Sequence, residues 1–330
     1  MTARTRYFVI VSLLVLIVGL GTGLVAHYVG FQPGALGRRG PAELKFVPVN
    51  ASLVAYADVQ AVMASEVRKH IRSALPLKED GQRQFQNQTG INIETDIDRV
   101  VAFVTPTAPA ATSSRGWAMV LARGRFDNVK VEALMREHGA HVEQYKTDRL
   151  IVADPDQGGS QLSLAFLEPG LVAIGSVELV RAAIDMKQSG ANVTSNEDMM
   201  RHIQDIEFGT AWAAGRFDVL TSQAQLPPAF AQQLPPLTWF GAGVQVNGGV
   251  RGVVRGEARD EESANSLRDV AKGFMALAKL QTRSNARYEP FLRSLELGGS
   301  GNIVTLSFDL PLEMIDALRA LGAPAVPKQQ

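Results

Sequence analysis

Cysteine is absent from this chain of 330 residues. Its absence excludes disulfide bonds, thiolate metal sites, iron–sulfur clusters, thiol nucleophiles and lipid attachment to cysteine. An excess of basic charge is also lacking, because 33 Lys and Arg residues balance 33 Asp and Glu residues. A protein that binds nucleic acid normally gathers a basic excess on one face. We therefore expect no nucleic acid partner.

Motifs of the common catalytic sites are missing as well. Gly241-Ala242-Gly243 precedes a predicted strand, whereas a dinucleotide fingerprint opens a helix after a strand. Gly298-Gly299-Ser300-Gly301 lacks the spacing of a nucleophile elbow, and no lysine has a serine three places before it. The sequence therefore predicts no catalytic residue, no cofactor and no metal ligand, and the protein is not expected to be an enzyme.

One long uncharged stretch stands near the amino terminus. Tyr7 to Phe31 contains no Asp, Glu, Lys or Arg over 25 residues. A helix of this length covers about 37 Å, which exceeds the roughly 30 Å hydrocarbon core of a bilayer. The alternative is a cleavable signal peptide, but a cut after Ala26 would place Leu24 where a small residue is needed. We predict a retained transmembrane helix that acts as a signal anchor.

The orientation of this helix rests on a short basic tail. Arg4 and Arg6 precede the helix, and Arg38, Arg39 and Lys45 follow it, so the count of positive charges is nearly tied. Long domains translocate largely regardless of charge, and a short basic tail is typical of a signal anchor. We expect a single-pass protein of the cytoplasmic (inner) membrane with an extracytoplasmic, periplasmic main domain; a cytoplasmic domain is the alternative. The predicted segments are a cytoplasmic tail 1–6, a transmembrane helix 7–31 and a stalk 32–44.

The rest of the chain has the composition of a globular protein, with 46% hydrophobic and 20% charged residues. Its length exceeds what one hydrophobic core usually holds. We predict an α+β body in two halves, 45–190 and 200–322, followed by a flexible tail 323–330. Each half is expected to follow the order β-α-β-β-α-β-β-α, with antiparallel sheets covered by helices. This shared order suggests an internal duplication.

Apolar alternation and helical spacing place the individual elements. In the first half, strands are predicted at 53–57, 98–104, 116–126, 149–153, 161–167 and 171–175, and helices at 59–75, 128–138 and 177–187. In the second half, strands are predicted at 210–217, 237–246, 250–258, 291–297 and 302–308, and helices after 217, at 260–280 and at 311–320. Gly-Arg-Phe-Asp occurs at 124–127 and 215–218, but not at equivalent places, so the duplication rests on element order.

Local signals mark the ends of these elements. An aspartate follows four predicted strands, where its carboxylate would accept hydrogen bonds from the first turn of the next helix. These residues are Asp58, Asp127, Asp218 and Asp309. Asn247-Gly248 predicts a hairpin with a type I′ turn, since both residues tolerate positive φ.

Two sets of side chains are candidates for a binding site. His138 and His141, with Glu143 beside them, form the only histidine cluster, but Gly139 is expected to end a helix between them, which predicts a solvated helix end and not a metal site. Arginines repeat along single strand faces, where they could bind an anion. Pairing with carboxylates of the sheet is the simpler expectation. These arginines are Arg123, Arg125, Arg251, Arg255 and Arg259.

Two segments suggest a family. Lys45 to Val59 with Met63-Ala64-Ser65, and Gly170 to Ser176 with Val180 to Asp185, resemble uncharacterised bacterial envelope proteins. The resemblance implies one amino-terminal membrane helix and an extracytoplasmic α+β region, and it carries over no catalytic residue.

Two classes of function follow. The first is a membrane-tethered, non-catalytic binding or scaffold protein of the cell envelope, which contacts the bilayer through residues 7–31 and an unidentified partner through sheet edges or the loops 105–115 and 226–237. The second is a carrier or an enzyme with a lipid or small-molecule site in a cleft between the halves. The sequence does not define the oligomeric state.

Overall fold

The computed structural model describes nine parts of the chain. They are residues 40–68, 86, 90–106, 117–153, 161–187, 191–206, 209–218, 237–281 and 289–313. Within these parts, no helix is both long enough and apolar enough to cross a membrane. The predicted transmembrane helix, both terminal tails and most of the stalk and of the two partner loops lie outside the described residues.

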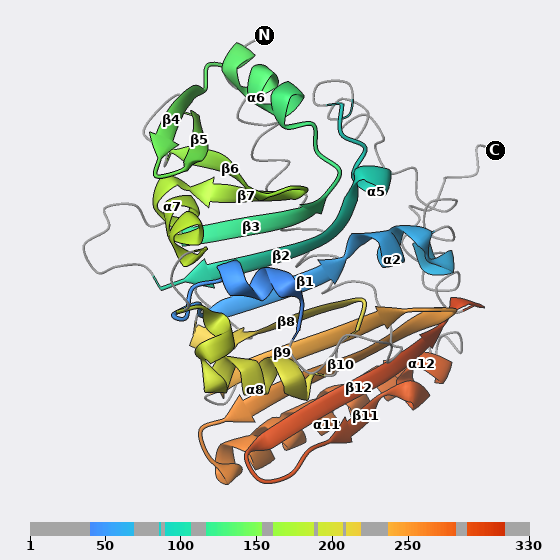
Figure 1. The fold of residues 1–330 in the computed structure, drawn as a ribbon. Coiled ribbons are helices and arrows are strands. Elements are labelled where there is room, and N and C mark those ends of the chain that lie inside the picture. Colours follow the sequence, from blue (N-terminus) through green and yellow to red (C-terminus); the bar gives the residue numbers. More distant parts are fainter. Residues whose placement is uncertain are drawn as a thin grey trace, which may run out of the picture.

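Twelve antiparallel strands form one continuous sheet (Figure 1). Its order is β11-β12-β10-β9-β8-β1-β2-β3-β7-β6-β5-β4. The strands of the first half are β1 (Leu53–Asp58), β2 (Ile97–Thr105), β3 (Trp117–Gly124), β4 (His141–Tyr145), β5 (Asp148–Ala153), β6 (Leu162–Glu168) and β7 (Leu171–Ser176). Those of the second half are β8 (Ala211–Arg216), β9 (Leu237–Val246), β10 (Gly249–Ala258), β11 (Glu296–Gly298) and β12 (Ile303–Pro311).

Pairing of β1 with β8 joins the two predicted halves. Tyr56 lies opposite Trp212, and Ala55 lies opposite Ala213. The α+β class and the antiparallel pairing are confirmed, but the expected separate sheets are one sheet. The first strand of each half is a sheet edge within its own half, and these two edges satisfy each other's backbone hydrogen bonds.

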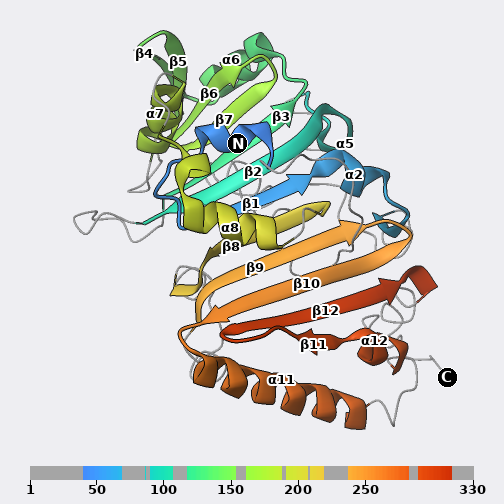
Figure 2. The same cartoon turned by 60° about the horizontal axis from the view of Figure 1, so that its bottom comes forward.

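Helices cover both faces of this sheet (Figure 2). One face carries η1 (Ala42–Phe46), α7 (Val177–Met186), η2 (Val193–Ser195) and α8 (Glu197–Asp205). The opposite face carries α2 (Val59–Ala64), α5 (Ile93–Asp96), α6 (Asn128–Glu137), α11 (Glu261–Gln281) and α12 (Glu289–Ser294). We call these the α8 face and the α11 face.

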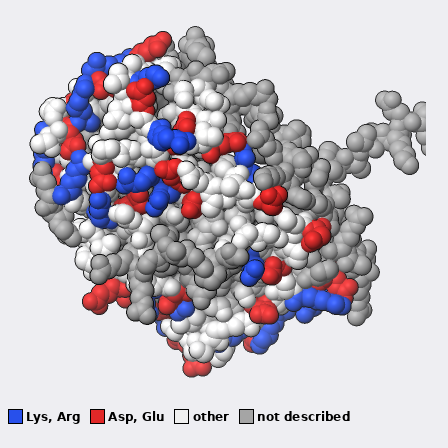
Figure 3. All heavy atoms as spheres, turned by 45° about the vertical axis from the view of Figure 1, so that its right-hand side comes forward, with Lys and Arg blue, Asp and Glu red and all other residues white. Residues whose placement is uncertain are grey.

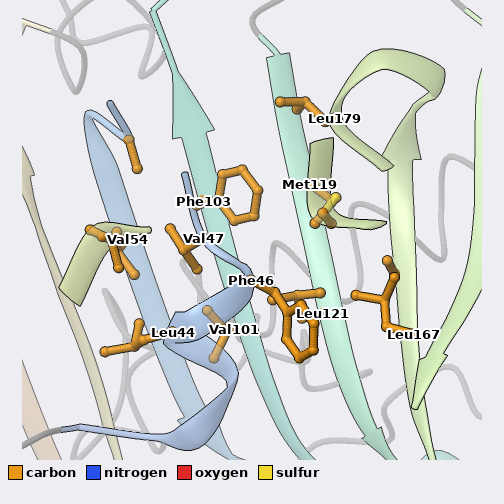
Figure 4. Close-up of a cluster of buried hydrophobic side chains, with 14 of the residues drawn as sticks. Leu44, Phe46, Val47, Val54, Val101, Phe103, Met119, Leu121, Leu167 and Leu179 are labelled. Atoms are coloured by element: carbon orange, nitrogen blue, oxygen red, sulfur yellow. The ribbon is translucent and has the colours of Figure 1, made fainter. Parts of the chain in front are cut away.

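The largest apolar cluster lies on the α8 face and extends across the junction of the halves. Leu44 and Phe46 of η1 reach over the strands toward Val101 and Leu121 (Figure 4). Leu44 is fully buried. The chain therefore packs against the sheet from η1 onward, two residues before the predicted end of the stalk at 44.

The sequence placed most strands correctly, and β9 has the predicted bounds of 237–246. It was wrong at 291–297, where α12 precedes the three-residue strand β11. The ring of Phe291 packs edge-on against Phe308 at 6.2 Å, and Glu289 pairs with Arg293 one helical turn later at 2.5 Å. The elements η1, α5, β4, η2 and α8 were also not predicted from the sequence.

Two of the four predicted aspartate caps are confirmed. Asp58 accepts a hydrogen bond from the amide of Ala61 at 2.8 Å, and Asp127 accepts one from the amide of Lys130 at 3.1 Å. Asp309 was predicted wrongly, because β12 continues past it to Pro311.

Asp218 accepts hydrogen bonds from the guanidinium of Arg216 at 2.8 and 3.1 Å. Asp309 instead lies 3.4 Å from the guanidinium of Arg251 on β10. Asp218 and Asp309 therefore each pair with an arginine side chain.

The hairpin between β9 and β10 is confirmed, but its turn is not type I′. Val246 pairs with Val250, which leaves three residues in the connection. Gly248 alone among them has a positive φ, at 67°. A three-residue connection needs only one residue in the left-handed region, whereas a type I′ turn needs two.

Candidate functional sites

The histidine cluster lies between the end of α6 and the β4–β5 hairpin, and its Glu143 connects this hairpin to α7. Gly139, with φ of 89°, ends α6 as predicted, and His138 Nδ1 lies 2.8 Å from the carbonyl oxygen of Leu134. His141 Nε2 lies 3.2 Å from Glu143 Oε1. Arg181 of α7 donates to the other carboxylate oxygen of Glu143 at 2.7 Å.

Hydrogen bonds from His141 and Arg181 hold the pKa of Glu143 below its usual range. The described residues include no group of three side chains that could hold a metal ion. Glu143 joins the β4–β5 hairpin to α7 through its ion pair with Arg181.

Further contacts hold the tip of the same hairpin against α7. Tyr145 donates from its hydroxyl to Asp185 Oδ2 at 3.1 Å, and Lys146 Nζ lies 2.5 Å from Asp185 Oδ1. The guanidinium of Arg181 lies over the Tyr145 ring at 5.2 Å. These contacts secure β4, which forms one edge of the sheet.

Replacing His138 and His141 with alanine is expected to change the free energy of unfolding by less than about 1 kcal/mol, because exposed pairs contribute little. Metal analysis of the purified protein should give the same result for the variant and the unchanged chain. A stoichiometric metal that the double variant loses would contradict this assignment.

A second charged cluster connects η1 to the ends of β3 and β6 by ion pairs. Arg123 donates from Nε to Glu43 Oε1 at 2.5 Å and from Nη2 to Glu168 Oε2 at 3.1 Å. Lys45 Nζ lies 2.5 Å from the second oxygen of Glu168. Glu43 is 1% exposed, and its Oε2 has no hydrogen-bond partner among the described residues.

The charges of this cluster compensate one another. Burial alone would lower the pKa of Arg123, but hydrogen bonds to Glu43 and Glu168 outweigh burial and raise it. Hydrogen bonds from Lys45 and then Arg123 lower the pKa of Glu168. The cluster thus holds η1 in place.

Other arginines at the strands also pair with carboxylates. Arg255 pairs with Asp205 of α8 at 2.9 Å, and Arg125 lies 3.6 Å from Asp96. The predicted pairing with carboxylates of the sheet is confirmed at Arg123 and Arg251, which pair with Glu168 of β6 and Asp309 of β12. It was wrong at Arg125 and Arg255, whose partners belong to the helices α5 and α8.

A buried histidine lies between α8 and the sheet. His202 is 4% exposed, and its ring stacks on Trp239 with centroids 4.3 Å apart. Its Nε2 lies 3.6 Å from Glu257 Oε2. Burial lowers the pKa of His202, although the carboxylate of Glu257 acts in the opposite direction. The other charged groups that act on it are Arg201, Asp205 and Arg255.

This lowered pKa predicts a dependence of stability on pH. Unfolded chains protonate His202 near pH 6.5, whereas the folded protein does so only at lower pH. Folding stability is therefore expected to fall as pH decreases below about 6.5. The unfolding free energy of His202→Gln, compared with that of the unchanged chain between pH 7.5 and 5, should depend less on pH. Equal slopes for the two proteins would contradict the prediction.

The third candidate is a strip of exposed apolar side chains on the α11 face. Phe274 is 48% exposed, Leu277 59% and Leu280 56%, all on the second half of α11. Val254, in the middle of β10, is 48% exposed on the sheet below. We call Phe274, Leu277 and Leu280 the α11 strip.

The packing of α11 explains where the strip begins. Ala264 and Leu267 of its first turns pack with Ala258 and Val304 at one end of the sheet. At the opposite end, α12 covers Val250 and Leu310 through Phe291. Val254 lies between these two covered ends and keeps about half its surface exposed. Large apolar side chains that are exposed and grouped on one helix, as in the α11 strip, commonly mark an interaction site.

Sequence reasoning predicted this helix at 260–280 but did not identify the strip. A usable signal is present in residues 270–281, where apolar residues occupy more than one side of the helix: Val270, Phe274, Met275, Leu277 and Leu280. A helix that packs on a sheet through one side needs only one apolar stripe.

On the side of the molecule drawn in Figure 3, charges of both signs lie close together. In the view of Figure 3, basic and acidic side chains are intermingled over the upper part of the molecule. This distribution agrees with the equal numbers of basic and acidic residues in the chain.

Comparisons with known proteins identify no family. No family model matches the chain, and no curated protein matches it. The chain is similar to a solved structure, crystal form I of TP0453, with a TM-score of 0.44 and 9% identical residues. The match covers 85% of this chain and 97% of that chain.

Proposed function

We propose that this protein is a membrane-tethered, non-catalytic binding protein of the cell envelope. Residues 7–31 would anchor it in the cytoplasmic membrane, with the folded domain outside the cytoplasm. The uncharged stretch supports the anchor, and the resemblance of residues 45–59 to envelope proteins supports the location.

The observation that carries the binding role is the α11 strip. The charged clusters around Arg123 and Glu143 are engaged in ion pairs that hold elements of the fold together. The strip instead presents Leu277 and Leu280 to the outside with more than half of their surface accessible. Apolar area of this kind is removed from water when a partner covers it.

Photocrosslinking in native membranes tests this proposal. A photoreactive amino acid at Leu277 of the full chain should give a discrete adduct, whose lipid or protein component is then identified. Val129 is a matched control, since it is a 79% exposed apolar residue isolated on α6. Equal labelling at the two positions, or no adduct at Leu277, would refute binding through the strip.

The alternative function is a carrier or an enzyme with a lipid or small-molecule site between the halves. Such a site would need space at the junction of β1 and β8. On the α8 face, the described junction residues are closely packed: Tyr56 stacks on Trp212 at 5.7 Å, and Met199 and Ile203 of α8 are fully buried beside them. No observation favours this alternative over binding at the strip.

We also propose that the two halves arose by duplication. Reading outward from the junction, β1-β2-β3-β7-β6 corresponds to β8-β9-β10-β12-β11. In each series the third strand is followed by a helix, which is α6 in the first half and α11 in the second. Of the last two strands, the one farther from the junction (β6 or β11) comes first in the sequence, and the nearer one (β7 or β12) follows. The β4–β5 hairpin has no counterpart among the described residues of the second half.

An experimental structure provides the test of the duplication. Superposing the five strands of one series on the other should also align α6 with α11. The duplication would be refuted if fewer than half of these elements coincide in order and direction.

A further inference from the structure

We propose that α8 is an acid-sensitive element, which opens from the sheet in mildly acidic solution while the rest of the domain stays folded. Protonation of His202 drives this opening. The inference depends neither on the membrane tether nor on the α11 strip. The open state would expose apolar side chains that the closed state buries fully, among them Met199 and Ile203.

His202 lies where an added charge would be poorly hydrated. It is on the buried side of α8, which packs on β8 and β9 (Figure 2), and its ring is stacked on Trp239 with 18° between the two planes. One helical turn later, Ile206 approaches β9 so closely that a methyl group on Gly241 would clash with it. An imidazolium ion held under α8 would therefore lose most of its contact with water, which disfavours the charged form.

The charged groups around His202 cancel one another. Two arginines and two carboxylates act on the ring, and they come from α8 itself and from β10: Arg201, Asp205, Arg255 and Glu257. Asp205 pairs with Arg255 at 2.9 Å, and Glu257 Oε2 lies 3.6 Å from His202 Nε2 and 3.8 Å from Arg201 Nη1. A proton on His202 would add a positive charge to this balanced set, and burial is accordingly the largest effect on its lowered pKa.

Arg201 also opposes protonation through a direct contact. Its Nη2 lies 3.5 Å from His202 Nε2, and a guanidinium group can only donate a hydrogen bond. The contact therefore suits a neutral ring whose Nε2 accepts. Protonation would turn it into a contact between two positively charged donors.

The opening is local because α8 is a short helix outside the hydrogen-bonded sheet. It has nine residues, and helices shorter than about 12 residues are marginal in water without packing. The strands beneath it, β8 and β9, keep their hydrogen bonds to each other and to β1 and β10 when the helix leaves. Elements of this kind open with a smaller free energy than that of global unfolding.

The coupling between opening and protonation sets the size of the effect. In the open state the hydrated ring takes up a proton near its ordinary pKa of 6.5, whereas the closed state keeps it neutral to lower pH. Opening therefore binds a proton. Its equilibrium constant should rise about tenfold between pH 7.5 and pH 5.5.

Hydrogen exchange of the full chain, followed by mass spectrometry, tests this inference. Exchange rates of the amides of α8 and α7 are corrected for the intrinsic effect of pH and converted to opening constants. The reference is α7, because it packs in the same apolar cluster and contains no histidine. We expect the opening constant of α8 to rise about tenfold between pH 7.5 and pH 5.5 and that of α7 to stay unchanged.

Two variants identify the group that takes up the proton. His202→Gln keeps a planar side chain but does not titrate, so it should abolish the rise at α8. His138→Gln, at an exposed position on a different helix end, should leave the rise as it is. An equal rise at α7 and α8, no rise at α8, or a rise that persists in His202→Gln would overturn the proposal.

A measurement on the unchanged chain serves if His202→Gln does not fold. The ring nitrogens of His202, observed by nuclear magnetic resonance, should show a neutral imidazole at pH 6 in the folded protein. A ring that is already protonated there, with α8 amides still protected, would likewise refute the acid-driven opening.

Discussion

Replacing Trp212 with alanine is expected to lower the free energy of unfolding by about 3–5 kcal/mol. Trp212 is fully buried on β8 and stacks on Tyr56 of β1 across the junction of the halves. Its removal would leave a large cavity in the apolar cluster that contains residues of both halves. The surrounding strands are hydrogen-bonded on both sides, so they cannot collapse to fill it.

Urea unfolding followed by circular dichroism measures this loss. Trp212→Phe should cost less, because it keeps an aromatic ring at the site. Val254→Ala is the matched surface control and should change stability by about 0.5 kcal/mol or less. A loss below about 1 kcal/mol for Trp212→Ala would contradict the packing at the junction.

Replacing Arg123 with alanine is expected to cost about 3 kcal/mol. The change would remove the cation that compensates Glu43, whose side chain is 1% exposed. A buried charge without its partner costs several kcal/mol, and this value lies at the lower end because Arg123 itself is 24% exposed. Arg123→Lys should restore stability only in part, since an ammonium cannot reproduce the two guanidinium contacts to Glu43 and Glu168.

A second substitution distinguishes charge burial from general disruption. Adding Glu43→Gln to Arg123→Ala removes the uncompensated charge and should recover part of the lost stability. The exposed pair Arg293 and Glu289 is the control, and Arg293→Ala should cost less than about 1 kcal/mol. If Arg123→Ala costs no more than Arg293→Ala, the buried cluster does not stabilise η1.

Local signals predicted much of the fold. Period-two alternation located β9 and β10, and the local geometry of a strand followed by a helix located the caps at Asp58 and Asp127. The joining of the halves was not predictable, because the pairing of Ala55 with Ala213 connects residues far apart in sequence. Either strand could equally have ended its own sheet or been covered by a helix.

For the candidate sites too, local sequence signals predicted some features, and long-range packing determined the others. Alternation along β3 and β10 indicated that Arg123 and Arg255 would pair with carboxylates, but not which ones. Glu43, the partner of Arg123, belongs to a segment whose glycines and prolines predicted a stalk. The exposure of Leu277 depends on which side of α11 packs on the sheet, and the sequence did not show that Ala264 and Leu267 pack with Ala258 and Val304.

Protease added to spheroplasts of a bacterium that expresses the full chain tests the central claim most directly. The account predicts that the domain from Gly40 onward is digested from outside while the cytoplasmic membrane is intact, and that the mature protein retains residues 7–31. A domain that stays protected until the membrane is lysed would reverse the orientation. A mature protein beginning near residues 24–30 would instead show that the amino-terminal segment is cleaved, and would contradict the tether.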